Sequence, residues 1–315
     1  MSHVALRKLR PADRRRILVA GGVAVLAIVT VILSVIALTQ FSGNPSANAS
    51  QATSPSETPT TTQAPDPTAT STPSSVVLVP PTRLLAAFDG RRVYRATVAA
   101  CPDPRTTFEV SSDGGVTWEG SDVAESTDST AALNLTAGSS DVVHMVTLTA
   151  ECAPQYLRSF VGGIEWQVFN SDLPVTWYFD PADGTTVNTP QGARSTPCTA
   201  VSMAATGSRA AVLCTDSTIF VTEDSAASWS SAISVRNAAA IGVSPRGYRI
   251  AVLDAEGCTG IQLGELVDGE FSDLGACLGV EAVQGDVAVT TAADGSTFVW
   301  AGDVFSGSPN GGATW

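Results

Sequence analysis

The sequence predicts an all-β fold, a β-propeller of five blades, with one transmembrane helix ahead of it. From residue 76 onward, short strand-like runs recur in the order strand, turn, strand, hairpin, and this order occurs five times. An aromatic residue follows each hairpin turn, at positions 118, 166, 229, 271 and 315, with spacings of 48, 63, 42 and 44 residues. A four-stranded propeller blade occupies about 40–50 residues, which three of the four spacings match.

Paired apolar runs define the first part of each repeat. The expected first strands are Leu84–Phe88, Ala132–Thr136, Ala200–Ala204, Ala239–Val243 and Val280–Val283. The expected second strands are Val93–Val98, Val142–Thr149, Arg209–Leu213, Arg249–Leu253 and Val287–Thr291. Turn residues separate the two runs, and no long segment has apolar residues at helical spacing. Almost no helix is therefore expected in this part of the chain.

The 63-residue spacing leaves a six-bladed alternative open. It contains a Pro-, Gly- and Thr-rich insertion at residues 170–197, in which Val175–Phe179 is typical of a strand and Asp183-Gly184 of its turn. If this insertion folds as an extra partial blade, the ring has six blades. The last repeat reaches only Trp315, one strand short of a complete blade. Val76–Val79 is expected to supply that strand, because closing the ring removes an exposed sheet edge.

One hairpin turn has a distinctive sequence, Ser111-Ser112-Asp113-Gly114-Gly115-Val116-Thr117-Trp118. Its Asp and its two Gly suit a tight turn with positive φ. It resembles the Asp box (Ser/Thr-x-Asp-x-Gly-x-Thr-Trp, also called the BNR repeat) of sialidase-like and related β-propellers. Ser308–Trp315 is a second copy with Asn for Asp, Thr222–Trp229 a third with Ala for Gly, and Ser159–Trp166 a fourth without the Asp. Gly264–Phe271 keeps only an Asp-Gly turn and an aromatic residue.

The resemblance implies a structural role for the box residues. The residues expected to hold these turns are Ser111, Asp113, Gly115, Thr117, Trp118, Asp224, Trp229, Asn310, Gly312, Thr314 and Trp315. Asp113 is expected to accept hydrogen bonds from backbone N–H groups of its turn, and Trp118 to pack between blades. In the families that carry the box, these residues lie at the blade periphery, away from the axial ligand site.

Three segments precede the propeller, which is assigned to residues 76–315. Residues 1–16 form a basic head, and residues 17–38 are uncharged and long enough to span about 30 Å of hydrocarbon. Arginines just before this run predict a single-pass protein of the cell membrane with a cytoplasmic N-terminus and an extracytoplasmic propeller. Residues 39–75, mostly Ser, Thr, Pro and Ala, predict a disordered stalk. The alternative is secretion after signal cleavage near Ala49, because Ala47-Asn48-Ala49 has the small-x-small form of a cleavage site.

Charge and cysteine content narrow the partners and cofactors. The net charge is −13, made up of +5 in residues 1–40, −2 in residues 41–75 and −16 in the remainder, so no nucleic-acid partner is expected. Six cysteines outside the cytoplasm predict three disulfides. Two pairs flank hairpins and the third pair follows the second strands of neighbouring repeats, which predicts Cys198–Cys214, Cys258–Cys277 and Cys101–Cys152. Paired C-x₂-C spacing is absent, so no metal and no cofactor are expected.

Catalytic chemistry is not indicated by the sequence. Sialidases bind the sugar carboxylate through three arginines, use a Tyr–Glu pair with an Asp, and carry an Arg-Ile-Pro motif near the start. Here Tyr248-Arg249-Ile250 precedes Ala251 and lies in the fourth repeat, so Arg249 is interpreted as an exposed residue of an alternating strand. His144, a lone histidine on an expected strand, is interpreted as structural. No catalytic residue is assigned.

The sequence therefore predicts a membrane-anchored extracytoplasmic propeller that acts as a binding module for a protein or a cell-envelope glycan at its axial face. One alternative is a diverged sialidase-like glycoside hydrolase. Another is an assembly factor for an envelope complex.

Overall fold

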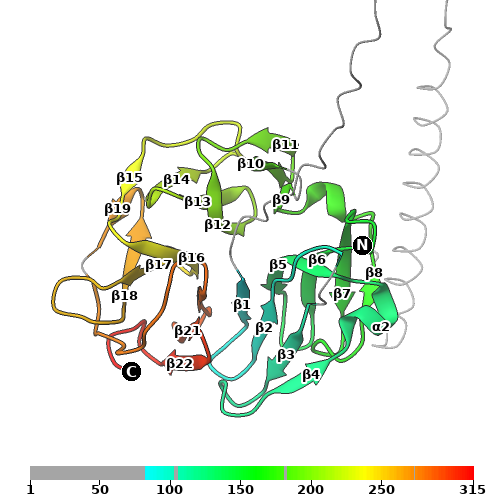
Figure 1. The fold of residues 1–315 in the computed structure, drawn as a ribbon, viewed down its shortest axis with the longest axis horizontal. Helices are drawn as coiled ribbons and strands as arrows, with labels where there is room; N and C mark the ends of the chain where they lie inside the picture. Colours follow the sequence, from blue (N-terminus) through cyan, green and yellow to red (C-terminus); the bar gives the residue numbers. More distant parts are fainter. Residues whose placement is uncertain (1–81, 103–105, 181–182, 273) are drawn as a thin grey trace, which may run out of the picture. The chain divides into compact units, whose positions relative to one another are not determined.

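The structure is a computed structural model that describes residues 82–102, 106–180, 183–272 and 274–315. These residues form six antiparallel sheets that follow one another around a ring (Figure 1). The fold is a six-bladed β-propeller. The predicted five blades are wrong, and the six-bladed alternative is correct.

Each blade is one sheet, with its strands in sequence order. Blade 1 contains β1 (Arg83–Ala87), β2 (Val93–Thr97), β3 (Phe108–Ser111) and β4 (Glu119–Ser121). Blade 2 contains β5 (Ala131–Ala137), β6 (Val143–Leu148), β7 (Pro154–Ser159) and β8 (Gln167–Val168). Blade 3 contains β9 (Tyr178–Asp180), β10 (Asp183–Thr189) and β11 (Gly192–Ser195). Blade 4 contains β12 (Ala200–Thr206), β13 (Arg209–Cys214), β14 (Thr218–Thr222) and β15 (Ile233–Ser234). Blade 5 contains β16 (Ala238–Ser244), β17 (Gly247–Leu253), β18 (Ile261–Val267) and β19 (Glu270–Phe271). Blade 6 contains β20 (Val287–Thr291), β21 (Thr297–Ala301) and β22 (Val304–Ser308).

Helix is scarce in the described residues, as predicted. It is limited to α2 (Val123–Thr127) and one 3₁₀ turn, η1 (Leu173–Val175). Asp122 caps α2, because its side chain accepts a hydrogen bond from the backbone N–H of Glu125. No helix in the described part of the chain is long and apolar enough to cross a membrane. The predicted segment 17–38 lies outside the described residues.

Blade 3 accounts for the error in the blade count. The 63-residue spacing between Trp166 and Trp229 contains this whole blade. Its central strand β10 has the sequence DGTTVNT, in which only Val187 is a buried apolar residue. A strand so polar gives little apolar alternation, and the blade ends without a box turn.

The predicted order of the strands in the last repeat is also wrong by one strand. Val280–Val283, expected as a first strand, forms no strand, and Val287–Thr291 is the first strand of blade 6, not its second. Among the described residues this blade has three strands. Val76–Val79, which was expected to add the fourth, lies outside the described residues.

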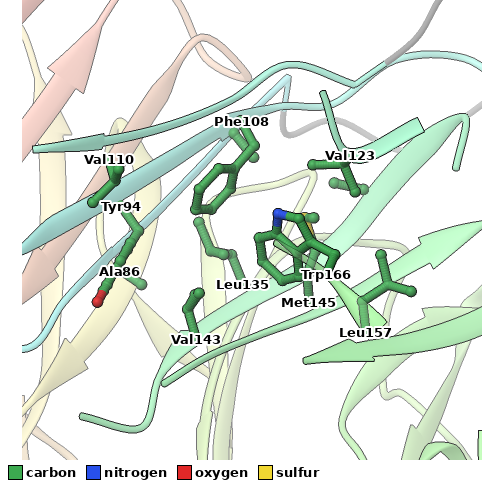
Figure 2. Packing of buried hydrophobic residues seen from close by; sticks show 12 residues of the cluster. Ala86, Tyr94, Phe108, Val110, Val123, Leu135, Val143, Met145, Leu157 and Trp166 are labelled. Carbon is green, nitrogen blue, oxygen red and sulfur yellow. The ribbon is translucent and has the colours of Figure 1, made fainter. Parts of the chain in front are cut away.

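Four hydrophobic cores lie between neighbouring blades of the described residues: between blades 1 and 2, 3 and 4, 4 and 5, and 5 and 6. Between blades 1 and 2, Tyr94 and Phe108 of blade 1 pack against Met145, Leu157 and Trp166 of blade 2 (Figure 2). The rings of Phe108 and Trp166 meet edge to face, with centroids 4.9 Å apart. Such pairs add to the stabilisation that apolar burial gives. In blade 5, for example, Ile250 of β17 packs toward blade 4 and Ala251 toward blade 6.

Four turns share one hydrogen-bonding scheme, and we call them the box turns: Ser111–Trp118, Ser159–Trp166, Thr222–Trp229 and Ser308–Trp315. In each, the first hydroxyl accepts a bond from the backbone N–H four residues later. These bonds are Gly115 N to Ser111 (2.7 Å), Gly163 N to Ser159 (2.8 Å), Ala226 N to Thr222 (2.9 Å) and Gly312 N to Ser308 (2.9 Å). The same local chemistry therefore recurs in blades 1, 2, 4 and 6.

The acidic or amide residue of three box turns closes the turn. Asp113 accepts hydrogen bonds from the backbone N–H groups of Val116 (3.1 Å) and Thr117 (2.9 Å). Asp224 accepts one from Ser228 N at 2.9 Å, and Asn310 one from Thr314 N at 3.0 Å. These bonds, led by the one from the Thr117 backbone, lower the pKa of Asp113 to about 2.

The tryptophan at the end of every box turn contacts the preceding blade. Trp118 meets Phe305 of blade 6 edge to face at 4.9 Å, as Trp166 meets Phe108 of blade 1. The indole N–H of Trp229 donates to Ser195 O of blade 3, and that of Trp315 to Ala276 O beyond blade 5. The box turns therefore join neighbouring blades.

The two rims of the ring are built differently. Three of the four box turns bond to the turn between the first and second strands of their own blade, and this end of the strands defines one rim, the box rim. These bonds are Gly114 N to Arg91 O, Gly162 N to Asp141 O and Ser225 N to Ser208 O, at 2.7–2.8 Å. The three disulfides, Cys101–Cys152, Cys198–Cys214 and Cys258–Cys277, are the predicted pairs. All three lie at the opposite ends of the strands, on what we call the cysteine rim.

Candidate functional site

The first strands of the blades surround a cavity of about 790 Å³ on the ring axis. Five of its walls are β1, β5, β12, β16 and β20, and the sixth is formed by residues 175–177 with Phe179 and Pro190. We call this cavity the axial channel. It has the size of a site for a small ligand or a short segment of a larger one.

Small apolar and hydroxyl-bearing side chains dominate the lining of the channel. Its hydroxyl and amide groups come from Asn134, Thr136, Tyr156, Thr176, Ser202, Thr206, Ser244, Thr290 and Thr291. Trp177 is buried and is held by a 2.8 Å hydrogen bond from its indole N–H to Gly207 O of blade 4. Asn134 donates to Trp177 O at 2.6 Å, which ties blade 2 to this segment.

Arg83 is the one charged residue among the described residues of the lining. It forms an ion pair with Asp286 at 2.6 Å and lies over the ring of Trp300, with its guanidinium carbon 4.6 Å from the ring centroid. Both partners belong to the last blade or the segment that enters it, so Arg83 also closes the ring between blades 1 and 6. Its charge is already neutralised, which leaves the channel without a free ionic group among those residues.

His144 lies behind the channel wall in blade 2. Its Nδ1 is 2.8 Å from the hydroxyl of Tyr156, a lining residue, and 3.2 Å from Nε of Arg158. Burial, followed by the Arg158 charge, lowers the pKa of His144. Because Arg158 donates to Nδ1, that nitrogen is an acceptor and His144 is the neutral Nε2–H tautomer. The hydrogen bonds give His144 a structural role in the wall.

Glu265 is a buried carboxylate close to the channel, and it is fully engaged. It accepts a hydrogen bond from Ser244 of the lining at 2.6 Å, pairs with Arg246, and lies 3.7 Å from Arg249. Arg249 is only 9% exposed, so its interpretation as an exposed strand residue is wrong. The period-2 pattern suggested solvent on one side of β17, whereas both sides of this strand face a neighbouring blade.

The predicted box residues lie on the box rim, and none of them is among the residues that line the channel. They surround the ring in blades 1, 4 and 6, whereas the channel is formed by the innermost strands. None of the lining residues was predicted from the sequence as a site residue. The available signal was the first apolar run of each repeat, because the first strand of a propeller blade faces the axis.

Comparisons with known proteins add no family. No family model matches the chain, and no curated protein matches it. Similar solved structures include YCF48 bound to D1 peptide, at 15% identity and a TM-score of 0.41, covering 76% of this chain and 81% of that one. AofleA from Arthrobotrys oligospora has 14% identity and a TM-score of 0.47, with 74% and 83% covered. The six-bladed fucose-recognising lectin of Aleuria aurantia has 12% identity and a TM-score of 0.42, with 74% and 98% covered. Because every one of these TM-scores is below 0.5, no ligand is inferred from them.

Proposed function

We propose that this chain is a membrane-anchored, stalk-borne propeller outside the cytoplasm, related to the Asp-box propellers, and that it binds a protein or a cell-envelope glycan in its axial channel. The observation that supports binding is the chemistry of the lining: small apolar walls, spaced hydroxyl and amide groups, and one arginine that is already paired. Such a surface suits a neutral ligand with both apolar faces and hydrogen-bonding groups.

The same lining favours binding over glycoside hydrolysis. Hydrolysis of the ordinary kind needs two carboxyl groups about 5–9.5 Å apart across the scissile bond. No Asp or Glu is among the described residues that line the channel. The buried carboxylate behind the wall, Glu265, is held by Ser244 and by two arginines, so it is poorly placed to donate or accept a proton in a reaction.

A pair of matched variants tests this proposal. Ala205 lies in the channel wall, whereas Ala193 is exposed on β11 and is not among the lining residues. The full-length protein in detergent would be screened against a glycan array and a peptide library, and each hit titrated. Ala205→Trp is expected to weaken binding at least tenfold by filling the channel, and Ala193→Trp to leave it unchanged.

A negative result for binding is equally well defined. Turnover of a fluorogenic glycoside by the full-length protein, abolished by substitution of one carboxylate, would refute the binding proposal. Equal affinity of the wild type and Ala205→Trp for a confirmed ligand would place the site elsewhere. Protease treatment of sealed membranes tests the anchor separately, because residues 1–16 and the propeller would lie on opposite sides of the membrane and only one of them would be protected.

A further inference from the structure

Exposed large apolar side chains are concentrated in blade 2 and the segment after it. Nine such side chains occur among the described residues, and five of them lie between residues 160 and 175: Phe160, Val161, Ile164, Val168 and Val175. The other four are scattered over blades 1, 5 and 6 and their connections. A cluster of this kind on an otherwise polar surface marks an interaction site more often than single exposed residues do.

The box turn of blade 2 differs from that of blade 1 chiefly at side chains that meet solvent. It keeps the Ser159 hydroxyl bond, two glycines with φ of 69° and 93°, and the buried Trp166. At the positions of Ser112 and Asp113 of blade 1, however, it has Phe160 and Val161. These two side chains are 49% and 47% exposed, and Ile164 of the same turn is 59% exposed.

The apolar residues are not needed to form this turn. In blade 1 the equivalent of Val161 is Asp113, which accepts two backbone N–H groups and stabilises the same conformation. Blade 2 lacks those bonds and presents apolar surface to water in their place. Both changes are unfavourable for an isolated domain, so they indicate a function that the other turns do not have.

The surface beside the turn is held in place. The rings of Phe160 and Phe169 meet edge to face, with centroids 5.8 Å apart. The guanidinium of Arg158 lies 5.0 Å from the Phe169 ring and is fixed by an ion pair with Asp172 at 2.6 Å. Because these contacts are made within the chain itself, little ordering entropy would be lost on docking.

We propose that Phe160, Val161, Ile164 and Phe169, the blade-2 apolar surface, dock a partner protein that presents apolar side chains flanked by Lys or Arg. Residues 76–315 carry a net charge of −16. Beside the surface, the exposed carboxylates of Asp141 and Glu165 outnumber the guanidinium of Arg92, and Arg158 is neutralised by Asp172. This charge attracts a basic partner and repels both an anionic bilayer and a second copy of the chain.

Synthetic peptides serve as probes for this chemistry. The full-length protein in detergent would be titrated with an amphipathic peptide of alternating Leu and Lys, and with its Leu and Glu counterpart. Val161→Asp is the informative variant, because it introduces the residue that holds the turn in blade 1 and therefore is expected to keep the fold intact. Val116→Asp is its control, since Val116 is the 81% exposed residue of the blade 1 turn. Thermal denaturation checks that both variants fold.

The sign of the effect separates docking from simple charge attraction. If the blade-2 apolar surface is the site, Val161→Asp weakens binding of the Leu/Lys peptide at least tenfold, although it adds a negative charge. Val116→Asp leaves the affinity within twofold, and the Leu/Glu peptide binds more weakly than the Leu/Lys peptide throughout. Equal or tighter binding by Val161→Asp would overturn the proposal.

Two further measurements test the choice of partner. Sedimentation equilibrium would overturn it if the wild type formed a dimer that Val161→Asp abolished, because the occupant would then be a second copy. Cosedimentation with vesicles of three parts phosphatidylcholine to one part phosphatidylglycerol would overturn it in the same way if the wild type bound the vesicles more tightly than Val161→Asp, because the occupant would then be a bilayer. The expected result is a monomeric protein whose vesicle association, through residues 17–38, is the same for the wild type and Val161→Asp.

Discussion

The contact between Trp118 and Phe305 joins the first blade to the last, and its energy can be measured. Their centroids are 4.9 Å apart at an interplanar angle of 80°. The guanidinium carbon of Arg95 also contacts this indole, 4.0 Å from the centroid of the Trp118 ring. Edge-to-face aromatic pairs contribute about 0.5–1.5 kcal/mol beyond the burial of their area. We therefore expect a coupling energy of about 1 kcal/mol between these two side chains.

A double-mutant cycle isolates this coupling from the larger loss of apolar burial. Trp118→Ala, Phe305→Ala and the double variant would be unfolded in urea and followed by far-UV circular dichroism, because the change removes a fluorophore. The half-buried rings are expected to cost about 2–3 kcal/mol each when removed, below the about 3–5 kcal/mol of fully buried aromatic residues. The double variant is expected to cost about 1 kcal/mol less than the sum.

The matching pair in the next junction is the control. Phe108 and Trp166 have the same centroid distance, 4.9 Å, and are both buried, so their coupling is expected to be equal or larger. Additive effects at Trp118 and Phe305, within about 0.3 kcal/mol, would refute the idea that box tryptophans fasten the blades.

Three other predictions concern the turns and the disulfides. Asp113 has its pKa lowered to about 2 from 3.8, so the stability that its ionised form gives is complete above pH about 4 and is lost as the pH falls to about 2. Asp113→Asn, which imitates Asn310, is expected to remove that dependence, so urea midpoints of the two proteins converge between pH 5 and 2; parallel curves would contradict this. Ser225 has φ of 58°, and Ser225→Gly is expected to stabilise by about 0.5–1 kcal/mol, read as a higher Tm, whereas a lower Tm would show that no strain is relieved. Replacing both Cys101 and Cys152 by Ser opens a 51-residue loop and is expected to lower the free energy of unfolding by about 4 kcal/mol. Opening the 16- or 19-residue loop is expected to cost about 3 kcal/mol. Urea unfolding that ranks the three pairs in another order would contradict the loop-length argument.

Sequence patterns predicted the parts of the fold that repeat. The box turns identified blades 1, 2, 4 and 6, because a Ser or Thr, a Gly and a Trp at fixed spacing satisfy one local hydrogen-bonding scheme. Two cysteine pairs followed from hairpin geometry, and the third from the equivalent places of Cys101 and Cys152 in neighbouring repeats. Blade 3 remained an alternative because its sequence has no box turn, and because Val187 is the one buried apolar residue of its central strand.

The channel lining was not predictable in the same way. Alanine, serine and threonine at the innermost strands carry no chemical signature, and their meaning comes from six blades meeting at one axis. Burial of Arg249 was missed for a related reason. A strand between two blades has no solvent face, so a polar residue there must find a partner, here Glu265.

Because every disulfide lies at one rim, a thiol reductant would act on the ring asymmetrically. Reduction would release the links between Cys101 and Cys152, across blades 1 and 2, and those within blades 4 and 5. Hydroxyl bonds and indole contacts at the other rim contain no sulfur and would survive. After reduction, the cysteine rim is thus expected to become more flexible than the box rim, where the box turns still hold neighbouring blades together.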